Sequence, residues 1–322
     1  MAGILIFRPT VNVGHSIFLT LKSLRQTQEY NRDIIFRKDM HMKNIKLIAL
    51  DLDGTLFNKD GIISSANKEQ LNRAAAQGVD IVISTGRPFN GLPFEQIKDT
   101  TITYALTTNG ASVYKIEGKE CLYENGMDLD TIMPILDWIL AREIHIDIYM
   151  DGRGFTPIRC RENLGRLDVP ESLRKYMLAT RTPVEDLVGY VGDCGQKIQK
   201  INLNFYPQPD GTFLHRDETL QFLKANASIE VVCGGFNNFE ISKAGVTKRE
   251  GLEFLAHYLG TDLEHTMAMG DSENDLSMIN AAGIGVAMGN ASDDVKAIAD
   301  YITTTNNEDG VGEAIKKYIP TL

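Results

Sequence analysis

The sequence predicts an α/β protein, in which a parallel sheet carries helices on both faces and is interrupted by an inserted α+β domain. Short apolar runs alternate with helical segments in residues 44–126 and again in residues 237–322. Residues 127–236 mix strands and helices in a different order. Alternation of strand and helix is typical of a parallel sheet, because each parallel crossover needs a connecting segment, usually a helix. We therefore expect a sheet domain in two pieces with an insertion between them.

The first piece opens on an apolar run, Ile-Lys-Leu-Ile-Ala-Leu at 45–50, which predicts a buried parallel strand. Residues 65–77 have helical spacing and stop at Gly78, as helices often do. Further buried strands are expected at 79–84 and 103–108.

The same order returns near the C-terminus. A helix is expected over 248–259, ended by Gly260, and a strand over 265–269. A second helix over 276–282 and a short strand over 284–287 follow. This second piece completes the parallel sheet.

The inserted segment reads differently from both pieces. Helices are expected over 132–141 and 219–225, and strands over 145–150, 201–206 and 229–233. The only tryptophan, Trp138, falls in the apolar pattern of a helix and is expected in the core. The mixed order indicates a separate α+β domain.

Residues 1–43 stand apart in charge. They carry seven Lys or Arg and three acids, whereas the whole chain of 322 residues has a net charge of -10. We expect an extension outside the fold, ahead of a start at Met40 or Met42. The alternative is a basic helical arm that docks on a partner or a membrane surface.

Composition excludes several classes of function. With 43% hydrophobic and 24% charged residues, the chain is expected to bury an ordinary core. Its acidity disfavours nucleic acid and anionic lipid as partners, and no apolar run reaches the length of a membrane span. Cysteines without metal-site spacing predict reduced thiols and a cytoplasmic location. They are Cys121, Cys160, Cys194 and Cys233.

Polar segments follow the strands at the edge where open α/β sheets bind ligands. They are Asp51-Leu52-Asp53-Gly54-Thr55, Thr85-Gly86-Arg87, Asn109-Gly110, and Gly270-Asp271 with Asn274 and Asp275. Two carboxylates so close together favour a hard cation such as Mg²⁺, which prefers oxygen ligands. A glycine turn lets backbone N–H groups face a phosphate. Together these segments indicate phosphate chemistry with a metal ion.

The motifs Asp-x-Asp-Gly-Thr, Thr-Gly-Arg, a lysine and Gly-Asp-x-x-Asn-Asp, in this order, resemble those of the haloacid dehalogenase superfamily. The resemblance is to its Cof-type, sugar-phosphatase-like branch and covers about residues 44–322. It implies a Rossmann-like core with a type-2 α/β cap that closes over the strand ends. It also implies a Mg²⁺-dependent phosphatase of small phosphorylated metabolites, such as sugar phosphates, pyridoxal phosphate or flavin mononucleotide.

The resemblance implies a division of labour among the acids. Asp51 would be the nucleophile that takes the phosphoryl group, and Asp53 would protonate the leaving oxygen and then activate water. Asp51, the backbone carbonyl of Asp53 and Asp271 would hold Mg²⁺. Asp275 would support the metal site.

The phosphate-binding residues follow from the same resemblance. Thr85 and the N–H groups of Gly86 and Leu52 would bind the phosphoryl oxygens, and Asn274 would contact the phosphate. Lys248 would offset negative charge on the nucleophile and the phosphate.

Some assignments stay open at this point. Lys248 is followed by Arg249, where the family usually has glycine, and Lys243 is the alternative lysine. Arg87 either reaches the substrate or caps a helix or pairs with an acid. The glycine turns at 151–154 and 234–236 are either cap segments facing the site or, as we favour, ordinary hairpin turns.

Two other functions compete with the phosphatase. A phosphosugar mutase would return the phosphoryl group to substrate instead of water. A non-catalytic regulatory or binding module would use the basic arm to contact a partner.

Overall fold

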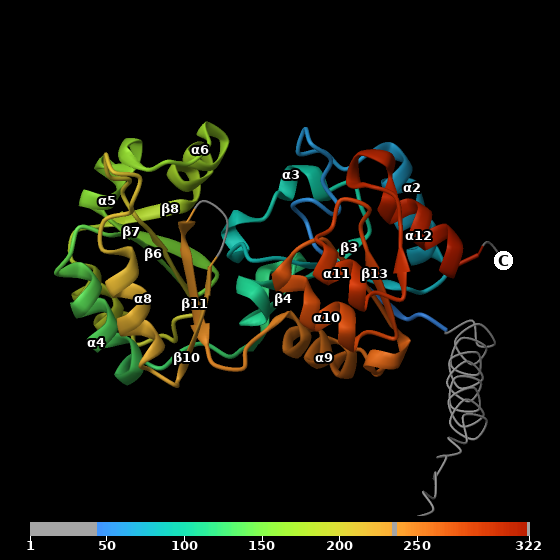
Figure 1. Ribbon diagram of the computed structural model, residues 1–322. Helices are drawn as coiled ribbons and strands as arrows, with labels where there is room; N and C mark the ends of the chain where they lie inside the picture. The colour runs from blue at the N-terminus through green and yellow to red at the C-terminus, as the bar shows by residue number, and fades with distance from the viewer. Residues whose placement is uncertain (1–43, 234–236, 321–322) are drawn as a thin grey trace, which may run out of the picture. The chain divides into compact units, whose positions relative to one another are not determined.

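The computed structural model describes residues 44–233 and 237–320. The predictions for residues 1–43 and for the turn at 234–236 lie outside the described residues. Within the described part, the strands form one sheet of eight and one of six (Figure 1). None of the described helices has the length and apolar character needed to cross a membrane.

The eight-stranded sheet has the strand order β14-β13-β12-β1-β2-β3-β4-β5. The first six strands in that order pair in parallel with their neighbours, and β4 and β5 add an antiparallel edge. The strands are β1 (Leu47–Leu50), β2 (Asp80–Ser84), β3 (Ile102–Thr107), β4 (Ser112–Lys115), β5 (Glu120–Glu124), β12 (Thr266–Gly270), β13 (Ile284–Ala287) and β14 (Tyr301–Ile302). All four residues of β1 are buried, as expected for a central parallel strand with both faces covered. The predicted α/β fold is confirmed.

Helices cover this sheet. They are α2 (Ser65–Ala76), α3 (Phe94–Ile97), α9 (Lys248–Tyr258), α10 (Leu276–Ala281), α11 (Asp293–Ile298) and α12 (Gly310–Tyr318). α2 packs against α12, and α10 packs against α9 and β13 (Figure 1). α2 begins where the Ser64 hydroxyl accepts a hydrogen bond from the Asn67 N–H, and it ends before Gly78, whose φ is +81°.

The six-stranded sheet has the order β10-β11-β9-β6-β7-β8. The strands are β6 (His145–Met150), β7 (Arg153–Pro157), β8 (Arg181–Val184), β9 (Lys200–Asn204), β10 (Ile229–Cys233) and β11 (Phe239–Lys243). The helices that accompany it are α4 (Leu129–Leu140), α5 (Ile158–Glu162), α6 (Glu171–Thr180), α7 (Leu187–Cys194) and α8 (Arg216–Lys224). We call this unit the cap, and the eight-stranded unit the core.

Alternating residues divide the two faces of the cap sheet. Ile146 and Ile148 of β6 are buried in the apolar cluster that also contains residues of α4 and α7. Trp138 of α4 packs on this cluster and stacks on Phe222 of α8, with 4.3 Å between ring centroids. The opposite face of the sheet is therefore left for polar side chains.

The inserted domain ends later in the sequence than residue 236, the boundary that we expected. β11 lies after residue 236, where we expected the core to resume, yet it pairs with β9 and β10. Phe239 and Ile241 are fully buried in the apolar cluster of the cap, which fixes β11 in this sheet.

Candidate active site

Asp51 lies at the centre of the parallel edge. β1 pairs with β2 on one side and β12 on the other, so the residues that follow these strands meet there. The Asp51 N–H donates to the Met269 carbonyl at 3.0 Å, which extends the strand pairing to the first residue of the loop. The Asp51 side chain is buried, at the edge where such sheets bind ligands.

Gly54 lets this loop fold against Asp271. Its φ is +89°, and a Cβ atom at this position would lie 2.4 Å from Asp271 Oδ2. The next residue, Thr55, donates from its hydroxyl to Asp271 Oδ1 at 3.2 Å. A side chain at position 54 would therefore push apart the two loops that carry the acids.

Lys248 joins two of the acids. It opens α9, where Thr247 and Glu250 form a capping box. Its Nζ is fully buried and donates to Asp51 Oδ1 at 2.7 Å and to Asp275 Oδ1 at 2.6 Å. Burial lowers the pKa of Lys248, but the two carboxylates outweigh burial and raise it. The alternative lysine, Lys243, donates instead from its Nζ to Asn125 Oδ1 at 3.0 Å. Asn125 directly follows β5.

Three carboxylates gather beside this lysine. Oxygens of Asp51, Asp271 and Asp275 lie within 4.8 Å of one another. Burial raises the pKa of Asp51 to about 8, with Lys248 opposing the rise, and burial with Asp275 raises the pKa of Asp271 to about 6. One lysine does not balance three carboxylates in a buried site. A hard divalent cation with oxygen ligands fits this donor set.

Asp275 is tied down as well as buried. Its Oδ2 accepts from the backbone N–H groups of Asp271 at 3.0 Å and Ser272 at 3.1 Å. Gly270 makes room for it, because a Cβ there would lie 2.4 Å from the Asp275 side chain. Asp275 therefore fixes the loop that presents Asp271.

Asp53 is not part of this group of three carboxylates and pairs with Arg87 instead. Arg87 Nε donates to Asp53 Oδ2 at 3.0 Å and Nη2 donates to Oδ1 at 2.6 Å. The guanidinium also lies 4.9 Å from the ring centroid of Tyr176, which belongs to α6 of the cap. Of the roles left open for Arg87, the structure shows pairing with an acid.

The predicted phosphate-binding residues lie on neighbouring loops. Thr85 is buried, and its hydroxyl accepts from the Arg87 N–H at 3.2 Å. Asn274 donates to Asn109 Oδ1 at 3.1 Å. Leu52 is fully buried.

The segments that carry the predicted site residues surround one cavity of about 740 Å³, which both the core and the cap line. Its core lining includes Asp51, Asp53, Thr85, Gly86, Arg87 and Asn274.

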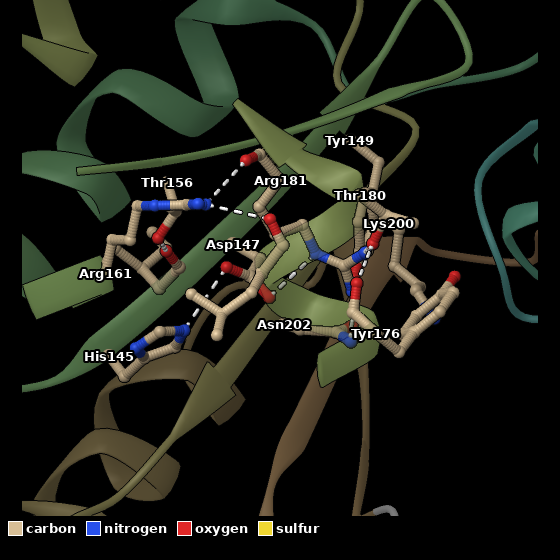
Figure 2. A network of polar contacts seen from close by, with 12 residues as sticks. His145, Asp147, Tyr149, Thr156, Arg161, Tyr176, Thr180, Arg181, Lys200 and Asn202 are labelled. Atoms are coloured by element: carbon tan, nitrogen blue, oxygen red, sulfur yellow. Dashed lines mark hydrogen bonds and ion pairs between the residues drawn. The ribbon is translucent and has the colours of Figure 1, made fainter. Parts of the chain in front are cut away.

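A polar network of the cap forms the opposite wall (Figure 2). Arg181 donates from Nε to Asp147 Oδ2 at 3.0 Å, from Nη2 to the Tyr149 hydroxyl at 2.5 Å and from Nη1 to the Thr180 hydroxyl at 2.5 Å. Burial raises the pKa of Asp147, but Arg181 and His145 outweigh burial and bring it to about 2. The wall therefore contains a buried, ionised pair.

β9 adds a polar row to the same wall. Lys200, Asn202 and Asn204 line the cavity, and Lys200 Nζ lies 3.1 Å from Glu240 Oε1 of β11. We did not identify these cap residues from the sequence. The signal that could have found them is the alternation Lys-Ile-Asn-Leu-Asn at 200–204, which places three polar side chains on one face of a strand.

Known proteins resemble this chain over most of its length. A family profile described as haloacid dehalogenase-like hydrolase matches residues 48–315. A 5-amino-6-(5-phospho-D-ribitylamino)uracil phosphatase of Bacillus subtilis is 31% identical over 281 residues, 86% of this chain and 96% of its own. The phosphatase YwpJ of the same organism is 34% identical over 294 residues, covering 84% and 99%. A solved haloacid dehalogenase-like hydrolase from B. subtilis superposes with a TM-score of 0.71 at 29% identity, covering 84% and 99%.

Proposed function

Because the chain belongs to the haloacid dehalogenase-like hydrolase family and is a hydrolase of its phosphatase type, we propose that it cleaves small phosphorylated metabolites with Mg²⁺, using Asp51 as nucleophile. The observation that carries this proposal is the position of Asp51. Its carboxylate is buried on the cavity, contacts Lys248 and lies within a cluster of three carboxylates. A carboxylate held in this way can attack a phosphoryl group that enters the cavity.

In the first step, an oxygen of Asp51 attacks phosphorus and the P–O bond to the leaving group breaks. Asp53, protonated for this step on one oxygen that Arg87 releases and still held through the other, gives its proton to the departing oxygen. In the second step, Asp53 takes a proton from water as that water attacks phosphorus. The P–O bond to Asp51 breaks, inorganic phosphate leaves, and both acids return to their starting states.

The carboxylates of Asp51 and Asp271, with the backbone carbonyl of Asp53, would hold Mg²⁺. When bound, the ion supplies positive charge that offsets the developing charge on the phosphoryl oxygens. Asp275 supports this site, since it holds the Asp271 N–H at 3.0 Å. Lys248 contributes a fixed positive charge against Asp51.

Neutral donors complete the phosphoryl site in this proposal. The Thr85 hydroxyl and the N–H groups of Gly86 and Leu52 bind the phosphoryl oxygens, and Asn274 contacts the phosphate. Each lies within four residues of the end of a core strand, and rigid strands would position all of them.

The cap wall supports a sugar phosphate or a similar polar ester as substrate. Asn202, Asn204 and Tyr149 offer amide and hydroxyl groups to the cavity, which suits a hydroxylated leaving group. The 5-amino-6-(5-phospho-D-ribitylamino)uracil phosphatase of B. subtilis is named for a phosphoribityl substrate, which has a hydroxylated leaving group. Free cysteines among the described residues support a cytoplasmic location.

A panel of phosphate esters tests the proposal. The full chain with Mg²⁺ is incubated with para-nitrophenyl phosphate, sugar phosphates, pyridoxal phosphate and flavin mononucleotide, and inorganic phosphate is measured. We expect release from para-nitrophenyl phosphate and faster release from at least one sugar phosphate. Exchange between sugar-phosphate isomers without phosphate release would replace the phosphatase by a mutase. Neither activity, together with a partner that no longer binds when residues 1–42 are deleted, would favour the non-catalytic module.

A further inference from the structure

A row of four polar side chains crosses from the core into the cap. Asn274 Nδ2 donates to Asn109 Oδ1 at 3.1 Å, and Asn109 Nδ2 donates to Glu240 Oε2 at 2.8 Å. The other oxygen of Glu240, Oε1, lies 3.1 Å from Lys200 Nζ. Asn109 and Asn274 belong to single-turn 3₁₀ helices of the core (Thr108–Gly110 and Glu273–Asp275), whereas Glu240 and Lys200 lie on the cap strands β11 and β9.

The side-chain nitrogen of Lys200 lies beside the core loop that contains Gly86. A Cβ atom built on Gly86 would lie 3.3 Å from Lys200 Nζ and 2.9 Å from Asn109 Oδ1. Gly86 follows Thr85 on the loop proposed to bind the phosphoryl group, and Gly86 and Lys200 line the same cavity. The cap therefore places a lysine ammonium at the phosphoryl end of the cavity.

The ammonium of Lys200 suits an anion that enters this space. Its side chain is 2% exposed, and among the described residues its one ion-pair partner is Glu240. An ammonium has three N–H donors, so two remain beyond the one directed at Glu240. Burial lowers the pKa of Lys200, although Glu240 opposes that shift, so a second anion would stabilise its charged form.

We propose that Lys200 is a substrate-binding residue that the cap delivers to the phosphoryl group, and that Glu240 is the residue that positions it. The inference rests on the proposed phosphatase function and adds a contact from the cap to the phosphoryl site of the core. Glu240 uses one carboxylate oxygen on Lys200 and the other on Asn109. It therefore fixes the cap lysine relative to Asn274, which is proposed to contact the same phosphate.

Arg181, a second buried cation of the cap, has different partners from Lys200. Arg181 is held by Asp147, Tyr149 and Thr180, which all belong to the cap. Lys200 is linked instead to Asn109 of the core through Glu240. Loss of Lys200 should consequently affect every phosphate ester, whereas a residue that recognises the leaving group should affect only some.

The test compares Lys200→Met with Lys197→Met, a matched loss of a nearby cap lysine that is 46% exposed. The full chain with Mg²⁺ is assayed with para-nitrophenyl phosphate and two sugar phosphates. We expect Lys200→Met to lower kcat/KM at least tenfold, by a similar factor for all three esters, and to weaken competitive inhibition by inorganic phosphate by a similar factor. Lys197→Met should leave all of these values within twofold of the wild type.

Equal kinetics in Lys200→Met and Lys197→Met would overturn the inference, and so would a loss confined to one leaving group. Glu240→Gln gives a second test if Lys200→Met fails to fold. We expect it to raise KM for every ester and the inhibition constant of inorganic phosphate, with a smaller change in kcat, whereas an unchanged inhibition constant would contradict the positioning role. A wild-type protein that releases phosphate from no ester would instead refute the proposed function itself.

Discussion

Arg87 holds both carboxylate oxygens of Asp53, with Nε to Oδ2 at 3.0 Å and Nη2 to Oδ1 at 2.6 Å. Asp53 is the proposed acid and base, and its side chain is 61% exposed, so core packing does not fix its direction. A two-point contact with a planar guanidinium fixes a carboxylate better than a single contact does. Arg87 therefore sets the orientation of Asp53 in this structure.

We predict that Arg87→Met lowers kcat about tenfold or more while KM changes less, because Asp53 loses its fixed orientation for proton transfer. Steady-state kinetics with para-nitrophenyl phosphate provide the measurement. Arg249→Met serves as the control, because Arg249 pairs only loosely with Glu253, at 3.9 Å. A kcat that stays at the wild-type value would show that Asp53 needs no partner.

Lys248 is predicted to be essential for stability as well as activity. Lys248→Met leaves Asp51 and Asp275 buried without their shared cation, which should cost about 3 kcal/mol or more in the free energy of unfolding. Urea unfolding at pH 7 measures this loss. Lys243→Met, which removes one hydrogen bond to Asn125, should cost about 1 kcal/mol. Similar losses in the two variants would argue against a special role for Lys248.

Mg²⁺ is predicted to stabilise the fold through Asp271. An ion that binds only the folded state stabilises it by about 2.7 kcal/mol when its concentration is 100 times its dissociation constant. Thermal unfolding with and without Mg²⁺ should therefore show a higher Tm with the ion, and chelation should stop phosphate release. Asp271→Asn should lose most of the Tm shift, while Asp294→Asn, at an exposed site on α11, should retain it. A shift of equal size in both variants would place the ion elsewhere.

The Asp147–Arg181 pair predicts a pH dependence of stability. The pKa of Asp147 is lowered from 3.8 to about 2 in the folded protein, so the ionised carboxylate stabilises the fold above pH 4 by roughly 2 kcal/mol. This contribution is lost as the pH falls from about 4 to about 2. Asp147→Asn should be less stable than the wild type at pH 7, and the difference should narrow at pH 3 in urea unfolding. A difference that stays constant from pH 7 to pH 3 would contradict the assigned shift.

Much of the core and its motif residues could be predicted from the sequence because their placement depends on local signals. Buried runs such as 45–50 identify parallel strands, and the residues after them meet at one edge whatever the exact pairing. At Gly54 two acid-bearing loops come too close for a side chain, and at Gly270 the Asp275 side chain folds back too close to its own loop for one. Such contacts leave a mark on the sequence, because glycine alone fits them.

The wall formed by the cap could not be predicted in the same way. Lys200 and Glu240 meet only because β11 lies between β9 and β10, which is a matter of long-range strand order. β11 was assigned to the core from its position in the chain, whereas the burial of Phe239 places it in the cap. The pairing of Arg87 with Asp53 likewise joins two loops and depends on the folded geometry.

The most direct test of the account concerns Asp51. Phosphate release from para-nitrophenyl phosphate with Mg²⁺ is measured for the wild type and for Asp51→Asn, with far-ultraviolet circular dichroism and thermal unfolding to establish that the variant is folded. We predict that a folded Asp51→Asn releases phosphate at least 1,000-fold more slowly (about 4 kcal/mol in the barrier), because the amide cannot attack phosphorus as the carboxylate does. Release by the folded variant at a rate near that of the wild type would contradict Asp51 as the nucleophile.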